Sequence, residues 1–351
     1  MTTRHFIGRS LAVLAAVALC TVALSAQKKV RIIQTNSAGD NVHLIDPATN
    51  KVVGVIEGIE VNHGAGVAPD GSRIYVSNEA ESTLDIVDAK TLKVIKHVPL
   101  SGHPNNMAVG GDGKRVYVGI IQTPGGVDVI DTASMTRVKT VPTKGTIHNA
   151  YVTPDGKYVV AGSIQGKTIN VIDAKTEETA WVLEMDLGIR PMTFNTNPDG
   201  STKWIFAQLT GLNGFAVIDF AARKEVATIK LPDNGFGVEE RRLDSPSHGM
   251  GVAPDGRTLW VTSIAANSVY AYSLPELKLL GEARLPEIRV DGRKPTSSVP
   301  NWVTFTPDSK RVYVATENND SVAVIDVPSQ KLVTRIKVGS SPKRNITVTM
   351  R

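Results

Sequence analysis

The sequence predicts an all-β protein, a seven-bladed β-propeller with four antiparallel strands in each blade. A tripeptide of the Pro-Asp-Gly type begins at residues 69, 111, 154, 198, 254 and 307, and most copies are followed by a strand that ends in Ile-Val-Asp or Val-Ile-Asp. A repeat of about 40–45 residues with four strands per unit is the signature of a propeller. The two chain ends supply complementary parts of one further unit, which brings the expected number of blades to seven.

The clearest copy of the repeat spans residues 61–99 and contains four runs of β-forming residues. They are residues 64–68, 73–78, 83–88 and 92–98. Pro69-Asp70-Gly71 joins the first two runs, because proline presets φ for a type I turn and glycine suits the last turn position. Asp88 ends the third run, where its carboxylate can hydrogen-bond the backbone of the next turn. One such meander cannot bury both of its faces, so it must stack against copies of itself.

The first and last strands of the chain are expected to share a blade. Residues 30–34, 41–46 and 51–57 match the second, third and fourth runs of the repeat, but no first run precedes them. The missing strand is found at residues 344–350, which have no successor. We therefore expect a closing blade with its inner strand from the C-terminus and its three outer strands from the N-terminus. This pairing removes the two exposed edges of an open ring.

The blades can be assigned along the chain from these turns. Six lie at about residues 61–102, 103–145, 146–189, 190–247, 248–299 and 300–339, and the closing blade joins residues 340–351 to 27–60. Two blades are longer than the others, with polar, Pro- and Gly-rich loops at residues 232–247 and 286–299. Long loops in a compact fold are usually functional or disordered, and we expect these two to be functional because they lie beside the candidate site described below.

Residues 1–26 have the pattern of a secretory signal peptide. Arg4 and Arg9 form a basic start, residues 11–24 are apolar, and small residues precede Gln27. The apolar run is shorter than a membrane span requires. We expect cleavage after residue 26, no stable transmembrane anchor, and a periplasmic or secreted protein; an uncleaved anchor is the alternative.

Composition excludes several classes of function. Cys20 is the only cysteine of the 351-residue chain and lies within the signal peptide, so the mature protein has no disulfide, thiolate metal site or cysteine nucleophile. The formal net charge of +5 is small, and lysine and arginine form no stripe with interleaved aromatic residues. Nucleic-acid binding is therefore not expected. We expect a monomer.

The second strands resemble those of the YVTN-type repeat family of bacterial extracytoplasmic seven-bladed propellers. The residues that carry the resemblance are Tyr75-Val76-Ser77-Asn78, Tyr117-Val118-Gly119 and Tyr313-Val314-Ala315-Thr316, each between a Pro-Asp-Gly-like turn and a Val-Ile-Asp strand. The resemblance covers essentially the whole mature chain. Related propellers include lactone hydrolases, a streptogramin lyase, partners of periplasmic quinoprotein oxidation and surface-layer proteins, so the resemblance implies the architecture and leaves the activity open.

The entry to the inner strands holds the clearest functional signal. Six residues before each turn, the chain has His63, Asn105, His148, Met192, His248 and Asn301, with Lys343 at about the same place in the closing blade. His103 lies two residues before Asn105, and Arg190 holds the matching position before Met192. Since inner strands surround the axis, these side chains are expected at one mouth of the channel.

Two kinds of site fit this set. His63, His148 and His248 come from alternate blades, and three neutral imidazoles with an open position suit a divalent transition metal such as Zn, Cu or Fe. The alternative is a polar small-molecule pocket without metal, with Asn105, Asn301, Arg190 and His103 as ligand contacts. A third reading is a wet channel mouth with a structural role only. The chain has no HExxH, CxxC or acidic calcium-loop motif.

Further candidates lie on the same face. Glu79 and Glu239 are the candidate catalytic bases, and Glu240 and Glu317 are related positions. Arg190, Arg241 and Arg242 could bind a carboxylate or phosphate. Trp302 directly follows Asn301 and could cover a ligand.

The sequence thus favours an exported binding protein that uses an axial pocket and its loops to hold a small molecule, a metal or a protein partner. One alternative is a metal-dependent hydrolase or lyase, similar to a lactonase, with the three histidines as ligands. Another is a structural envelope or surface-layer repeat protein. No catalytic motif decides between an enzyme and a binding protein.

Overall fold

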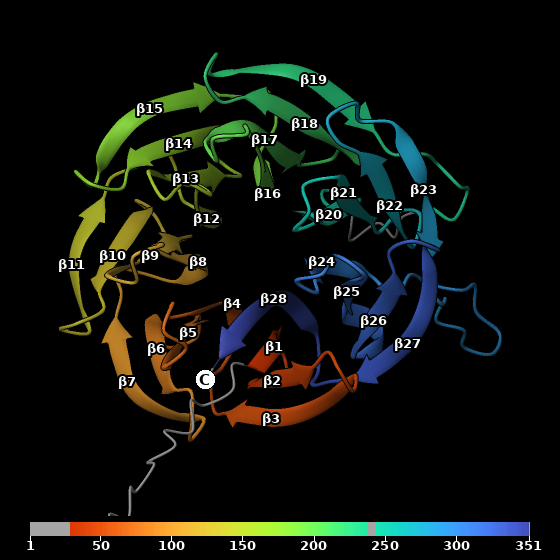
Figure 1. The fold of residues 1–351 in the computed structure, drawn as a ribbon, viewed down its shortest axis with the longest axis horizontal. Helices are drawn as coiled ribbons and strands as arrows, with labels where there is room; N and C mark the ends of the chain where they lie inside the picture. The colour runs from red at the N-terminus through yellow and green to blue at the C-terminus, as the bar shows by residue number, and fades with distance from the viewer. Residues whose placement is uncertain (1–28, 238–242, 351) are drawn as a thin grey trace, which may run out of the picture.

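The computed structural model describes residues 29–237 and 243–350. The described chain forms seven four-stranded antiparallel sheets, arranged as blades around a central axis (Figure 1). The seven-bladed all-β propeller is confirmed. The expected signal peptide, residues 1–26, lies outside the described residues.

In blades one to six, the first strand in the sequence is the innermost and the fourth is the outermost (Figure 1). Blades one to three consist of β4 (Asn62–Val67), β5 (Arg73–Asn78), β6 (Thr83–Asp88) and β7 (Lys93–Pro99); β8 (Pro104–Val109), β9 (Arg115–Ile120), β10 (Gly126–Asp131) and β11 (Thr136–Val141); and β12 (Asn149–Val152), β13 (Tyr158–Ser163), β14 (Thr168–Asp173) and β15 (Glu178–Glu184). Blades four to six consist of β16 (Ile189–Thr196), β17 (Thr202–Leu209), β18 (Gly214–Asp219) and β19 (Lys224–Lys230); β20 (Ser247–Val252), β21 (Thr258–Ser263), β22 (Ser268–Ser273) and β23 (Leu279–Arg284); and β24 (Pro300–Phe305), β25 (Arg311–Thr316), β26 (Ser321–Asp326) and β27 (Lys331–Lys337). A single 3₁₀ turn, η2 (Glu317–Asn319), connects β25 to β26.

The closing blade joins the two ends of the chain. Its strand order is β28 (Pro342–Met350), β1 (Lys29–Asn36), β2 (Asn41–Asp46) and β3 (Lys51–Glu57). β28 pairs antiparallel with β1, from Lys29 opposite Met350 to Asn36 opposite Pro342. The blue C-terminal strand lies beside the red N-terminal strand in Figure 1, so the predicted composite blade is confirmed.

Two recurring turns set the strand ends. In the Pro-Asp-Gly turn, the Gly71 amide donates to Ala68 O at 2.8 Å, and Gly71 has a φ of 73°, which glycine adopts without strain. In the turn after the third strand, Asp88 Oδ1 accepts hydrogen bonds from the amide and hydroxyl of Thr91 at 2.8 and 2.7 Å. These local bonds satisfy the backbone where the chain reverses.

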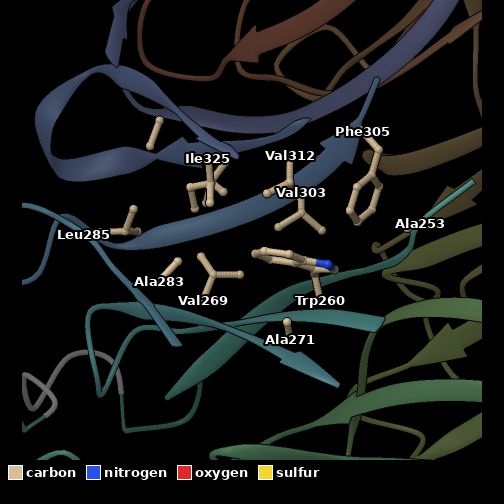
Figure 2. Close-up of a cluster of buried hydrophobic side chains, with 12 residues drawn as sticks. Ala253, Trp260, Val269, Ala271, Ala283, Leu285, Val303, Phe305, Val312 and Ile325 are labelled. Carbon is tan, nitrogen blue, oxygen red and sulfur yellow. The ribbon is translucent and has the colours of Figure 1, made fainter. Parts of the chain in front are cut away.

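The hydrophobic core lies between neighbouring blades. Figure 2 shows one such layer, in which Trp260 and Val269 of blade five pack against Val303 and Phe305 of blade six. The inner strands approach each other closely: a Cβ atom at Gly249 would lie 2.3 Å from Asn301 O. Small residues at these positions therefore allow seven strands to surround one axis.

The longer loops are partly fixed to the blades. Within residues 286–299, Ile288 pairs with Thr296 in an isolated bridge, and the Ser298 hydroxyl donates to Asn267 Oδ1 at 2.8 Å. Within residues 232–247, the Asp244 carbonyl accepts a hydrogen bond from the Gly211 amide at 2.9 Å. The described part of the chain contains no helical segment with the length and apolarity that a membrane crossing requires.

Candidate anion-binding site at the channel mouth

The inner strands begin around a pocket of 310 Å³ at one end of the channel. Three imidazoles line it, those of His63, His148 and His248. The remaining lining residues are also polar or charged: Asn105, Arg190, Asp244, Ser245, Asn301, Lys343 and Arg344. The structure therefore brings together residues from all seven blades that are far apart in the sequence.

A β-bulge at the start of the inner strands orients these side chains. In blade one, Asn62 lies opposite Asn78 but Ala65 lies opposite Val76, so His63 and Gly64 together face a single residue. The same irregularity occurs in blades two, four, five and six and in the closing blade. Bulges redirect side chains at functional sites, and here they lie beside the mouth of the channel.

In blade four the mouth position is held by Arg190 and not by Met192. Ile189 lies opposite Leu209 and Met192 opposite Ala207, which makes Arg190 the equivalent of His63. Counting back from the turn placed Met192 there because β16 has 8 residues, two more than the 6 of β4, and so begins further from its turn. Met192 instead lines a cavity deeper in the channel.

Arg344 crosses the axis from the closing blade. Its Nη2 donates to Asn105 Oδ1 of blade two at 2.6 Å and to Asn149 Oδ1 of blade three at 2.8 Å. The guanidinium carbon lies 4.8 Å from the ring centroid of Trp302 in blade six. Arg344 is only 4% exposed and lines the pocket, so its side chain closes the pocket at its inner end.

Within residues 29–237 and 243–350 the Arg344 guanidinium forms no ion pair, and the Glu79 carboxylate acts on its pKa without contacting it. Its Nε and Nη1 atoms have no hydrogen-bond partner in this part of the chain. Burial lowers its pKa to about 10, so the guanidinium stays protonated at neutral pH. The other two cations are neutralised: Arg190 Nη2 lies 2.7 Å from Asp244 Oδ2, and Lys343 Nζ lies 3.0 Å from Glu317 Oε1. A buried charge without a counterion is costly unless a ligand supplies one.

The three histidines are neutral. Burial lowers the pKa of His63 to about 4, and it lowers the pKa of His148 and of His248 well below the ordinary value; the Arg344 charge acts in the same direction on all three. The imidazoles can therefore exchange hydrogen bonds with a ligand without adding charge.

Hydrogen bonds assign a different tautomer to His148. His63 Nδ1 lies 3.1 Å from Val61 O, and His248 Nδ1 lies 3.1 Å from Asn301 O, so both Nδ1 atoms donate and both Nε2 atoms carry a lone pair. His148 Nδ1 instead accepts from Asn149 Nδ2 at 2.6 Å, because the Asn149 oxygen is bonded to Arg344. The pocket thus has two imidazole acceptors and one imidazole donor.

The predicted three-histidine metal site stays a prediction. A metal ion binds a nitrogen lone pair, and the tautomer of His148 places a proton on its Nε2. Within residues 29–237 and 243–350, no group of three or more His, Cys, Asp or Glu side chains is arranged to hold a metal ion.

The other residues predicted from the sequence that the structure describes lie outside the lining of the mouth pocket. His103 lies outside the pocket lining, with Nδ1 at 2.8 Å from Glu79 O. Trp302 lies beneath Arg344, with its ring centroid 6.0 Å from that of His248. Glu79 Oε2 lies 3.1 Å from His63 Nδ1, and burial raises the pKa of this carboxyl. Glu239, with Glu240, Arg241 and Arg242, lies outside the described residues.

Sequence reasoning missed Arg344, Asn149, Asp244 and Ser245. The one available signal was the position of Arg344 in the repeat, where blades one and five have the glycines Gly64 and Gly249. A long charged side chain at that position must extend into the channel.

The fold and the site together define a propeller with a polar, cationic mouth. The chain belongs to the cytochrome D1 heme domain family, which matches residues 27–349. A comparison with curated proteins found no match. The resemblance to the YVTN-type repeat family rests on the second strands of the blades. Membership of a propeller family is established by the match to the family model.

Solved structures that share the fold include the following three. The Pseudomonas aeruginosa periplasmic gluconolactonase PpgL is similar with a TM-score of 0.71 and 19% identity, over 91% of this chain and 99% of that one. Kuenenia stuttgartiensis hydrazine synthase gives 0.67 and 22%, over 81% and 88%. The dihydro-heme d1 dehydrogenase NirN, in complex with DHE, gives 0.60 and 17%, over 90% and 74%.

The described mouth residues do not fit the tetrapyrrole that the family name implies. A haem has broad apolar faces, whereas all ten lining residues are polar or charged. The volume of 310 Å³ is at the lower end of the roughly 300–1,000 Å³ typical of small-molecule sites. The donor set instead matches a small polar anion.

Proposed function

We propose that the protein binds a small carboxylate-bearing molecule at the channel mouth. The observation that carries the proposal is the buried guanidinium of Arg344, which has two nitrogen atoms without partners and forms no ion pair in the described chain. Arginine presents its donors as a planar fork that matches a carboxylate. Asn301 Oδ1 also lacks a partner and offers an acceptor for a ligand hydroxyl or amide.

The charges of the site favour a monoanion. Asp244 and Glu317 already pair with Arg190 and Lys343, which leaves Arg344 as the one cation of the mouth that forms no ion pair in the described chain. A doubly charged phosphate would place a second negative charge in the pocket without a counterion. A carboxylate with neutral hydrogen-bonding groups therefore fits best.

The test compares Arg344→Gln with Arg335→Gln, which removes an equal charge from the exposed strand β27. Isothermal titration with acetate, pyruvate and benzoate should give binding to the wild type and to Arg335→Gln. Arg344→Gln should bind at least about thirtyfold more weakly, since truncating one partner of a buried charge pair costs about 2 kcal/mol or more. Equal affinities in all three proteins would refute the proposal. The melting temperature of each protein without ligand provides the folding control.

A second candidate function is the hydrolysis of a lactone. It is favoured by the pair formed by His63 and Glu79, in which Nδ1 is held and Nε2 is free to take a proton. Water would attack the carbonyl carbon as its proton passes to His63; the ring C–O bond then breaks, and the proton passes to the leaving alkoxide. The product, a hydroxycarboxylate, would match Arg344. Turnover of δ-lactones should be lost in His63→Ala and kept in His97→Ala, a histidine of the outer strand β7.

Export completes the proposed function. The N-terminal signal pattern and the similarity of the fold to a protein described as periplasmic support it. N-terminal sequencing of the protein recovered from the cell envelope should give a mature chain that starts at Gln27.

A further inference from the structure

The channel continues on the far side of Arg344 and changes in character there. A second cavity, of 420 Å³, is lined by the later halves of the inner strands. Its walls include Val109, Val152, Phe194, Val252, Phe305 and Ile346. The described lining contains no charged residue.

A smaller cavity of 120 Å³, the junction cavity, lies between the two compartments and shares lining residues with both. Arg344 lines both the mouth and this junction, whereas Tyr151, Trp302 and Ile346 line both the junction and the second cavity. The guanidinium therefore lies at the boundary between a polar compartment and a mostly apolar one along the channel axis.

The apolar compartment is long enough for a chain. β28 runs along the axis, and Thr347 lines the second cavity three residues after Arg344. At about 3.3 Å per residue, Thr347 lies roughly 10 Å along β28 from the backbone of Arg344. The Thr304 and Thr347 hydroxyls on its wall lie 2.9 Å apart and bond to each other, so they need no ligand partner.

We propose that the ligand is an amphipathic monocarboxylate, with its carboxylate on Arg344 and an apolar chain in the second cavity. The inference rests on the proposed function and names the class of ligand for the same site. A carboxylate alone would match the charge and leave the apolar walls facing water. An apolar tail removes that surface from water, and burial of each methylene stabilises the complex. A second charged group on the tail would be buried without a partner, which excludes dicarboxylates.

Straight-chain alkanoates test the proposal on the mature wild-type protein. Acetate, butyrate, hexanoate and octanoate should bind with affinities that rise about fourfold per added methylene. 1-Octanol should bind at least about tenfold more weakly than octanoate, because it cannot pair with Arg344. Isothermal titration below the aggregation concentration of each ligand measures both effects.

A variant that fills the second cavity tests whether the alkyl chain of the ligand binds there. Ala108 lines this cavity, and Ala108→Phe should abolish the advantage of octanoate over butyrate while leaving butyrate affinity within twofold of wild type. Ala48→Phe, in an exposed turn of the closing blade, should keep the full chain-length series. Ala108→Leu serves as the milder variant if the phenylalanine lowers the melting temperature.

The outcomes separate the two proposals. Affinity that depends on Arg344 but stays flat from acetate to octanoate would overturn the amphipathic ligand and leave the carboxylate site intact. Carboxylate binding that is the same in wild type and Arg344→Gln would overturn the proposed function itself. A chain-length series that survives in Ala108→Phe would place the tail elsewhere and would also overturn the inference.

Discussion

Lys343 and Arg344 are neighbours on β28, yet a carboxylate neutralises only one of them in the described structure. Glu317 bonds Lys343 at 3.0 Å and also accepts a hydrogen bond from Asn301 Nδ2 at 2.8 Å. It therefore orders the mouth and at the same time reduces its positive charge. The positive charge that a ligand meets at the mouth therefore depends in part on Glu317.

Replacing Glu317 by glutamine should strengthen anion binding. The amide keeps an oxygen for Asn301 but leaves the Lys343 charge unpaired, so carboxylate affinity should rise about fivefold, or about 1 kcal/mol. The gain should shrink as salt is added, because screening weakens the freed charge. Titration of butyrate at two salt concentrations measures it. Glu178→Gln, which removes the same charge from the exposed strand β15, should leave the affinity unchanged.

At the residue scale, the repeat predicts positions better than side-chain directions. The regular distance from strand start to turn predicted the positions of His63, His148 and His248, which line one pocket. It failed at Met192 because β16 has 8 residues where β4 has 6, so the strand begins further from its turn. Arg344 could not be predicted from one blade, since its partners belong to three other blades and meet it only in the closed ring.

At the element scale, the aspartate at the end of each of several third strands stabilises the turn that follows it. Asp88, Asp131, Asp173 and Asp326 each accept hydrogen bonds from a serine or threonine three residues later. These bonds lower the pKa of each carboxyl below its ordinary value. Since the charged form is favoured in the folded state, their contribution is present above the unfolded pKa of about 3.9 and is lost as the pH falls through the folded pKa.

We therefore expect acid to destabilise the propeller through these turns. The urea midpoint of the wild type should fall more steeply between pH 4 and pH 2 than that of a variant with asparagine at all four positions. Asparagine still accepts the hydrogen bonds but cannot be protonated in this range. If the urea midpoint falls equally with pH in the two proteins, the turn carboxylates are not responsible for the loss of stability in acid.

The strands themselves were predictable because turn chemistry and β-propensity agree along the repeat. Asp88 and Pro69-Asp70-Gly71 mark strand ends that the structure places within a residue or two. The bulges were not predictable, since they displace residues such as Gly64 without changing the residue types of the strand. Pairing with a neighbour strand, and not local sequence, determines them.

At the scale of the whole molecule, ring closure and the ligand site depend on the same contacts. The Thr35 hydroxyl on β1 accepts from the Arg344 amide at 3.1 Å and lies 2.9 Å from the His63 carbonyl oxygen. The Gln34 side chain donates to the Arg344 carbonyl at 3.0 Å. The N-terminal strand therefore holds in place the residue that we propose to bind the ligand.

Thr35→Val should reveal this coupling. Valine has the shape of threonine without its hydroxyl, so the variant leaves buried partners unsatisfied and should lose about 1–3 kcal/mol of the free energy of unfolding. Carboxylate affinity should also fall several-fold, because Arg344 loses the contact that fixes its backbone. Thr168→Val removes an equally buried hydroxyl that donates to Lys144 O at 2.7 Å, away from the mouth. It should lose comparable stability with unchanged affinity. Equal affinities in the two variants would mean that closure of the ring and binding at its mouth are independent.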